Sequence, residues 1–236
     1  MFHLAIYTVI TGNYDTIKQP QVITPGAEYF LFTNNHGIED AGVWKVVYLN
    51  EGEIDGSVPE IANDNARISN IRLSRKVKML AHKYLTEGYN MSIYLDADML
   101  IKDDLSILSE LINDNVLMAA FKHSSCFSVR DEINGLTERG VVTPAVVENQ
   151  WQRYHEWGFK DDLGITENGI LIRRHNHPRV VELMELWWQE YLQGCLRDQV
   201  SLMPCVFKCG FMPHLRFIEG NIRRNEWVEV MRHQGK

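Results

Sequence analysis

The fold is decided by residues 91–98, which read MSIYLDAD. The first five residues form a short apolar run, typical of a buried strand, and two aspartates flank the alanine that follows. Because side chains at i and i+2 of an extended backbone project from the same side, Asp96 and Asp98 are expected to lie side by side. Adjacent carboxylates repel each other unless a cation compensates them, and Mg²⁺ or Mn²⁺ prefers such oxygen ligands. The alternative is that Asp96 caps a turn and Asp98 is solvated.

Segments of the same strand type recur along the chain and alternate with helical patterns. The predicted strands are Leu4–Ile10, Tyr29–Thr33, Trp44–Leu49, Met91–Leu95, Leu117–Phe121 and Gly169–Arg173. The predicted helices are Arg75–Leu85, Asp104–Ile112, Val146–Trp157 and Pro178–Tyr191. This alternation predicts an α/β fold with a mostly parallel central sheet flanked by helices and covered on both faces. No repeat or long linker divides the chain, so we expect a single domain over residues 1–236.

The overall composition excludes several function classes. The chain carries 24 Lys and Arg against 31 Asp and Glu, a formal net charge of −7, which gives no reason to expect nucleic-acid binding. No apolar stretch reaches the roughly 18 to 20 residues of a membrane-spanning helix, and no export signal opens the chain. The four cysteines have neither zinc-site nor disulfide-framework spacing. We therefore expect a complete, soluble, cytoplasmic protein with reduced thiols, for which peripheral membrane association stays possible.

Ligands of open α/β sheets bind at the carboxyl ends of strands, and three of the predicted strands end in polar residues. The first continues into residues 11–15 (TGNYD), the second ends in residues 33–35 (TNN), and the fourth continues into the aspartate pair. Gly and Asn are also the ordinary residues of tight turns, so turn formation explains the first two ends equally well.

Five segments, in this order, resemble the glycosyltransferase-like domain of the plant and bacterial TOD/MUCI group. They are residues 6–15 (IYTVITGNYD), 31–34 (LFTN), 94–99 (YLDADM), 167–174 (ENGILIRR) and 197–202 (RDQVSL). The resemblance covers nearly the whole chain and implies a single GT-A (Rossmann-like) domain. It also implies that the aspartate pair is the metal and nucleotide-sugar motif, with Mn²⁺ or Mg²⁺ as the metal and a UDP-sugar as the donor.

The resemblance also implies a donor-binding site at the strand ends. Its expected residues there are Thr8, Thr11, Gly12, Tyr14, Thr33, Asn34 and Asp96. Four cations, Arg72, Arg75, Lys76 and Lys78, lie on or before the helix that precedes the aspartates, where some could reach the donor phosphates. Arg75 and Lys78 are the better pair because residues three apart share a helix face. A solvated helix face is the alternative for at least half of the four.

The chain is more distantly similar to the family-8 retaining glycosyltransferases through Asn168-Gly169 and Asp198-Gln199. This similarity implies site roles for Asp198, Gln199 and Glu167 and favours transfer with retention. Inversion would instead require a carboxylate base near the acceptor, for which Asp198, Glu167 or Glu132 could serve.

That family closes its metal site with a C-terminal His followed by Gly and Lys, and this chain ends in residues 233–236, HQGK. The similarity implies His233 as a third metal ligand and Lys236 as a phosphate contact, although the spacing is tighter than in the family. His214 is the competing third ligand.

Several further residues have a structural explanation beside a functional one. Lys122, His123 and Glu132 follow a strand end and could line the cleft, but each is also a typical surface or capping residue. Aromatic residues recur at three-residue spacing in Val146–Trp157, where they could stack on a sugar ring, although such a stripe is more typical of a core.

These observations favour a metal-dependent glycosyltransferase that moves a sugar from a nucleotide-diphosphate donor to a glycan or lipid-linked acceptor. The alternative is a non-catalytic nucleotide-sugar or carbohydrate-binding protein of the same fold. A metal hydrolase is less favoured, because such sites gather more acids and histidines around two metals than this chain offers.

Overall fold

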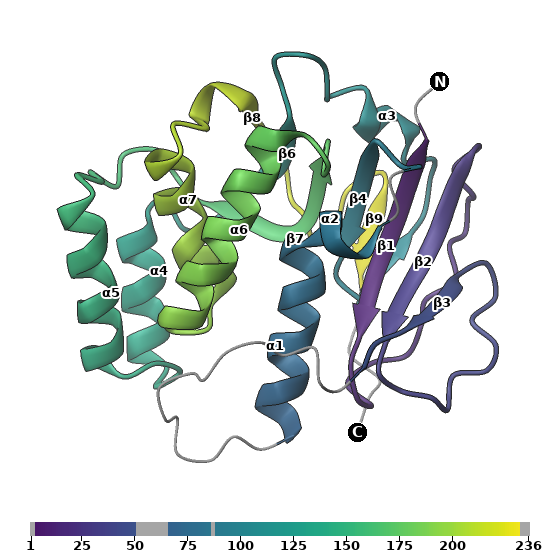
Figure 1. Ribbon diagram of the computed structural model, residues 1–236, viewed down its shortest axis with the longest axis horizontal. Helices are drawn as coiled ribbons and strands as arrows, with labels where there is room; N and C mark the ends of the chain where they lie inside the picture. Colours follow the sequence, from purple (N-terminus) through teal and green to yellow (C-terminus); the bar gives the residue numbers. More distant parts are fainter. Residues whose placement is uncertain (1–2, 51–65, 86–87, 232–236) are drawn as a thin grey trace.

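A computed structural model describes residues 3–50, 66–85 and 88–231 as a sheet with helices and a small ribbon packed on it (Figure 1). The strands are β1 (Leu4–Ile10), β2 (Ala27–Thr33), β3 (Lys45–Tyr48), β4 (Met91–Leu95), β5 (Met99–Ile101), β6 (Met118–Lys122), β7 (Thr166–Arg173), β8 (Leu215–Ile218) and β9 (Val228–Val230). The helices are α1 (Ala66–Met79), α2 (Ala81–Tyr84), α3 (Ser106–Ser109), α4 (Val129–Glu138), α5 (Pro144–Glu156), α6 (Pro178–Gln193), α7 (Asp198–Lys208) and the short η2 (Met212–His214).

The main sheet has the order β3-β2-β1-β4-β7-β6-β8. Neighbours among β3, β2, β1 and β4 are parallel, as are β6 and β8, whereas β7 is antiparallel to both β4 and β6. The predicted α/β class with a mostly parallel sheet is thus confirmed. Because β7 is reversed, its first residues lie at the edge of the sheet where β4 ends.

The two faces of the sheet are buried by different layers. Alternate side chains such as Tyr7 and Tyr94 pack against α1 and α4 to α7, which lie together on one face. The intervening side chains, such as Ile6 and Ile93, pack against α3 and the two-stranded β5–β9 ribbon. Burial on both faces explains why these strands are continuously apolar rather than alternating.

The predicted element boundaries hold best where the apolar runs are clearest. β1 and β4 have the predicted bounds, and β2, β3, β6 and β7 differ by one to three residues at their ends. The predicted helix Arg75–Leu85 is wrong in its bounds: α1 begins at Ala66 and breaks at Leu80, whose φ of −95° and ψ of 43° are not helical. The predicted helix Asp104–Ile112 shrinks to the single turn α3, because Leu111 and Ile112 donate to carbonyls only three residues back.

Helix α4 (Val129–Glu138) was not among the predicted helices. Ser128 caps it, because its hydroxyl accepts a hydrogen bond from the Asp131 N–H at 3.0 Å. The Asp161 carboxylate accepts from the next two free N–H groups, those of Val129 and Arg130. Side-chain acceptors thus satisfy three of the N–H groups that a helix start leaves unpaired.

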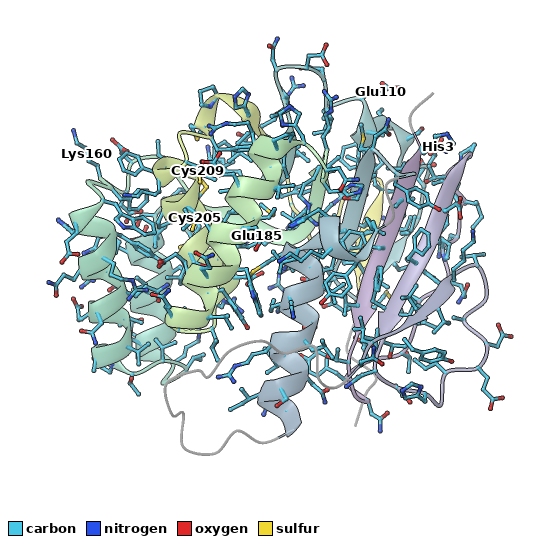
Figure 2. The ribbon with its side chains drawn as sticks, in the orientation of Figure 1. His3, Glu110, Lys160, Glu185, Cys205 and Cys209 are labelled. Atoms are coloured by element: carbon cyan, nitrogen blue, oxygen red, sulfur yellow. The ribbon has the colours of Figure 1, made fainter. Side chains whose placement is uncertain are left out.

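The aromatic stripe and the cysteines have structural roles. Tyr154 is buried, and Trp151 and Trp157 pack against the same core, which confirms the packing interpretation. All four cysteines are free thiols, including Cys205 and Cys209, which lie one turn apart at the end of α7 (Figure 2). Among the described helices, none combines the length and the apolar character that crossing a bilayer requires.

His175, just after β7, predicts acid sensitivity of the fold. Burial, with help from Arg173 and His82, lowers the pKa of His175 from 6.5 to about 3. The unfolded chain therefore binds a proton between these values and the folded chain does not, so stability falls as pH drops from about 6.5 toward 3. Between pH 7 and pH 5 the His175 contribution to the free energy of unfolding falls by about 2 kcal/mol. Urea unfolding of wild type and His175→Leu at both pH values measures this, and parallel pH profiles would contradict it.

Candidate functional site

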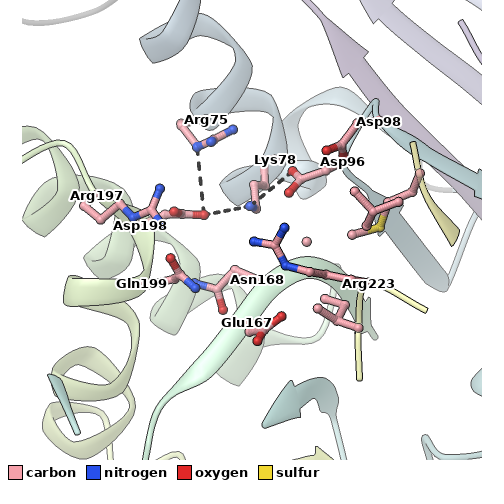
Figure 3. Close-up of a pocket in the computed structure, with 14 residues that line it drawn as sticks. Arg75, Lys78, Asp96, Asp98, Glu167, Asn168, Arg197, Asp198, Gln199 and Arg223 are labelled. Carbon is pink, nitrogen blue, oxygen red and sulfur yellow. Dashed lines mark hydrogen bonds and ion pairs between the residues drawn. The ribbon is translucent and has the colours of Figure 1, made fainter. Parts of the chain in front are cut away.

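One pocket, with a cavity volume of about 210 Å³, lies where β4 ends and β7 begins (Figure 3). Its lining residues are Arg75, Lys78, Asp96, Asp98, Met99, Glu167, Asn168, Gly169, Arg197, Asp198, Gln199, Ile222, Arg223 and Val230. Helix α1, the β4–β5 turn, the start of β7, the start of α7 and the segment between β8 and β9 all contribute. The fold thus brings into one pocket most of the charged residues that the sequence singled out.

The two aspartates lie in a turn, so the prediction that they project from an extended backbone is wrong. The strand ends at Leu95, and the Met99 N–H donates to the Asp96 carbonyl at 3.0 Å, which closes the turn between β4 and β5. The Asp96 N–H donates to the Gly169 carbonyl at 2.8 Å, which ties this turn to β7. Both side chains nevertheless line the same pocket.

The buried Lys78 side chain contacts two carboxylates of the pocket, those of Asp198 and Asp96. The Lys78 Nζ atom lies 2.7 Å from Asp198 Oδ2 and 3.5 Å from Asp96 Oδ1. It also lies 5.0 Å from the centre of the Tyr94 ring, and the Tyr94 hydroxyl donates to Asp96 at 2.6 Å. Arg75 shares this helix face, with its Nε atom 3.8 Å from Asp198. The predicted pairing of Arg75 and Lys78 on one face is confirmed.

Asp198 is held in its ionised form. Burial alone would raise the pKa of its carboxyl group, but Lys78 and Arg75 outweigh burial and hold the pKa well below its usual range. Burial lowers the pKa of Arg75, and the charges of Asp198 and Asp96 more than reverse that effect. Asp198 is therefore a fixed anion and a weak proton acceptor at any working pH.

Residues outside the pocket position its rim. Arg197 donates from Nε to Glu132 at 3.2 Å, so Glu132 holds a pocket residue instead of lining the pocket itself. Glu167 accepts hydrogen bonds from the backbone and hydroxyl of Ser124, and His123 lies 3.7 Å from it. Lys122 is exposed and pairs with Glu219. Of the two interpretations of Glu132, Lys122 and His123, lining of the cleft is therefore wrong, and the favoured structural or surface role agrees with the contacts observed.

Asn168 presents a donor to the pocket. It is 2 % exposed, and its Oδ1 accepts from the Thr166 hydroxyl at 2.7 Å. Within the described part of the chain, its Nδ2 has no hydrogen-bond partner. An unsatisfied buried donor costs stability, which a ligand oxygen would restore.

The chemistry of the described donor set fits a hard divalent cation. Asp96 Oδ1 is engaged by Tyr94 and Lys78, whereas Oδ2 lies over Gly169, 3.1 Å from where a Cβ on that residue would be. Asp98 adds a second carboxylate. Among the described residues, no group of three or more His, Cys, Asp and Glu is placed to hold a metal. The predicted third ligand His233 and the predicted phosphate contact Lys236 lie outside the described residues.

His214, the competing third ligand, is excluded by its position. It lies in η2, directly before β8, and its Nδ1–H donates to the Asn115 carbonyl at 2.9 Å. Because β8 runs parallel to β6, its beginning lies at the sheet edge opposite to the pocket.

The predicted donor-binding residues of β1 and β2 form a separate cluster beside the pocket helix. The Thr11 hydroxyl donates to the Asn70 carbonyl, the Gly12 N–H donates to Asn34, and the Asn34 amide donates to the Asn70 side chain. Gly12 has a φ of +60°, and an added Cβ would lie 2.6 Å from Asn70 Nδ2. Asn70 of α1 is a member that the sequence analysis missed.

The remaining residues predicted for this cluster do not join it. Thr8 and Thr33 are buried in their strands, and Tyr14 is exposed. None of the three lines the pocket. Arg197 and Arg223 do line it and were missed as site residues, because nothing in their local sequence separates them from surface arginines.

The sequence model of the family described as "TOD1/MUCI70, glycosyltransferase-like domain" matches residues 1–233. No curated protein matches. Among solved structures, apo mouse xyloside xylosyltransferase 1 is similar at 11% identity and a TM-score of 0.45, over 92% of this chain and 84% of that one. Galactosyltransferase LgtC with donor and acceptor sugar analogues is similar at 13% identity and a TM-score of 0.48, over 93% of this chain and 74% of that one. Glycosyltransferase GlyE of Streptococcus pneumoniae TIGR4 is similar at 14% identity and a TM-score of 0.44, over 92% of this chain and 45% of that one.

Proposed function

The chain belongs to the TOD1/MUCI70 glycosyltransferase-like family, and we propose that it is an active glycosyltransferase with a divalent metal and a UDP-sugar donor. The observation that carries the proposal is one pocket that holds the Asp96 and Asp98 carboxylates together with the Lys78-bound Asp198. This pocket offers oxygen ligands for a cation, positive charge for phosphates and oriented polar groups for a sugar. The proposed acceptor is a glycan or a lipid-linked sugar. The cytoplasmic location and peripheral membrane association stay predictions.

In this proposal Asp96 and Asp98 hold Mn²⁺ or Mg²⁺. A divalent ion supplies charge stabilisation to a leaving diphosphate without a proton donor. Arg75, Arg197 and Arg223 line the same pocket and contribute the positive charge that orients the diphosphate. The hydrogen-bonded cluster of Thr11, Asn34 and Asn70 is the proposed site of the nucleoside.

Asp198, Gln199 and Asn168 are the proposed contacts of the transferred sugar. Asn168 Nδ2 can donate to a sugar oxygen, and the fixed anion of Asp198 can accept from a sugar hydroxyl. A carboxylate whose pKa is held this low is a poor general base, which argues against Asp198 as the base of an inverting reaction. We therefore propose transfer with retention, and NMR of the anomeric proton of the product tests it.

The test of function is incubation with a panel of nucleotide sugars and Mn²⁺, with and without glycan acceptors. Acceptor-dependent release of the nucleoside diphosphate, lost in Asp198→Asn, is the expected result. Asp198→Asn is expected to keep UDP affinity within a few-fold, because the proposed contact is to the sugar. Saturable binding without turnover across the panel would support the non-catalytic alternative instead.

Gly169→Ala provides a steric test of the same pocket. The added Cβ would lie 2.5 Å from Met99 Cε and 3.1 Å from Asp96 Oδ2, so both side chains must shift. Overpacking of this kind costs about 1 to 3 kcal/mol. We expect UDP affinity in the presence of Mn²⁺, measured by calorimetry, to fall about tenfold or more, which corresponds to about 1.4 kcal/mol. Gly135→Ala on helix α4 is the control, and an equal effect of both variants would contradict the placement of the ligand.

A further inference from the structure

Arg173, the last residue of β7, is a buried cation outside the pocket. It is 0 % exposed, and within the described part of the chain no carboxylate lies within ion-pair distance of it. Its Nη2 donates to the Lys78 carbonyl at 2.8 Å and to the Tyr7 hydroxyl, and its Nη1 approaches the Met79 carbonyl at 3.4 Å. Its Nη1 also lies 3.0 Å from Met184 Sδ. A buried charge is expensive unless it is compensated, and these contacts stabilise it.

The compensation comes from the end of helix α1. The last carbonyls of a helix lack intrahelical partners and carry the negative end of the helix dipole. Lys83 N–H donates to Leu80 instead of Met79, which leaves the Met79 carbonyl to Arg173. The Tyr7 hydroxyl also donates to the Lys78 carbonyl, at 3.0 Å. Arg173 and Tyr7 together therefore cap α1 from the sheet and fix the residue at which it ends.

Lys78, the residue before the last one of α1, is the one whose side chain enters the pocket. Lys78 is held at its carbonyl by Arg173 and Tyr7, and at its ammonium group by Asp198 and Asp96. The Lys78 ammonium group lies 2.7 Å from Asp198 with the Lys78 backbone in its present position, and a shift of that backbone would move the ammonium group. A small displacement of a catalytic group is known to cost large factors in rate.

We propose that Arg173 is a positioning residue of the active site. It holds the Lys78 backbone in place through the Lys78 carbonyl and thereby places the Lys78 ammonium group between Asp198 and Asp96. The proposal rests on the proposed function for its kinetic consequence, but the placement of Lys78 can be tested without any activity. Arg173 itself does not line the pocket.

Two substitutions separate charge from geometry. Arg173→Met removes the cation and all its hydrogen bonds. Arg173→Lys keeps the charge, but a single ammonium cannot reproduce a planar fork that bridges several acceptors. Arg174→Met is the matched control, since Arg174 is the next residue and pairs with the exposed Asp114 at 3.0 Å. Tyr7→Phe removes one of the two hydrogen bonds to the Lys78 carbonyl and preserves Arg173, should Arg173→Met fail to fold.

The first measurement is a ¹³C NMR titration of the Asp198 carboxyl carbon, at a temperature where circular dichroism shows each variant folded. In wild type and Arg174→Met, Asp198 is expected to stay ionised to the lowest pH at which the protein is folded. In Arg173→Met the midpoint is expected to move up into the accessible range, with Arg173→Lys and Tyr7→Phe in between. Loss of thermal stability with an unmoved Asp198 titration would overturn the proposal, because Arg173 would then serve the fold alone.

The second measurement is kinetic. Loss of charge-assisted contacts that hold a catalytic group is expected to lower kcat in Arg173→Lys about tenfold to a hundredfold, with KM for the donor changed less. Wild-type kcat in a folded Arg173→Lys with a shifted Asp198 titration would also overturn the catalytic part of the proposal. If wild type itself shows neither turnover nor donor binding, the proposed function fails, while the Asp198 titration still decides whether Arg173 positions Lys78.

Discussion

Replacement of Lys78 by Met will lower the free energy of unfolding at pH 7 by about 3 to 5 kcal/mol, because it removes the 2.7 Å partner of the buried Asp198 carboxylate and leaves Arg75 at 3.8 Å. Without Lys78, burial is expected to raise the pKa of Asp198, so the deficit is largest where Asp198 must stay ionised and shrinks as pH falls and the carboxyl group protonates. Urea unfolding at pH 7 and pH 5 measures both effects. Donor turnover should be lost in the same variant.

The double variant Lys78→Met with Asp198→Leu identifies the cause. A buried ion pair replaced by apolar side chains is often as stable as the original, so the double variant is expected to recover most of the lost stability. Lys83→Met is the control, because Lys83 pairs with Glu185 at the surface, where such pairs contribute less than about 1 kcal/mol. A double variant as unstable as Lys78→Met would show that the unpaired carboxylate is not the source of the loss.

The second large effect is expected from Asp98→Asn, which should lower turnover by about two orders of magnitude or more and weaken Mn²⁺ binding. Asp96 also bonds Tyr94 and Lys78, so its replacement would change contacts of the fold as well as the proposed metal site. Removal of one of two adjacent negative charges should leave the stability of the metal-free protein unchanged or slightly raised.

Electron paramagnetic resonance of Mn²⁺ and thermal unfolding test these expectations separately from turnover. Asp114→Asn is the matched control, since the Asp114 side chain is fully exposed and pairs with Arg174. Undiminished turnover and Mn²⁺ affinity in Asp98→Asn would remove the aspartate pair from the proposed metal site.

Local patterns predicted the fold well where one segment determines its own structure. β1 and β4 are continuous apolar runs with polar ends, and both were predicted with the observed bounds. Helix α4 could have been found from Ser128 and Asp131, whose spacing is that of a helix cap. The reversed direction of β7 could not, because an apolar run has the same composition in either direction.

The same difference between local patterns and long-range contacts applies to the residues of the site. Arg75 and Lys78 were predicted as a pair because helix geometry places residues three apart on one face. The roles of Glu132 and Arg173 were not, since they depend on contacts to Arg197 and Lys78, 65 and 95 residues away along the chain. Such contacts exist only after the sheet and helices have assembled, so the local spacing of residues does not predict them.

The β5–β9 ribbon bears on how the protein should be handled at the bench. It pairs Met99–Ile101, directly after the aspartates, with Val228–Val230, and the Met231 N–H donates to the Asp98 carbonyl at 2.7 Å. A purification tag fused behind residue 236 would thus start only a few residues from a strand that braces the aspartate turn. Leu4, by contrast, begins β1 at the opposite sheet edge, because β1 runs parallel to β4. In a protein of residues 1–236, affinity tags and fluorescent labels for the assays above therefore belong ahead of residue 1, and a fusion behind residue 236 with weak Mn²⁺ binding should be recloned before its activity is interpreted.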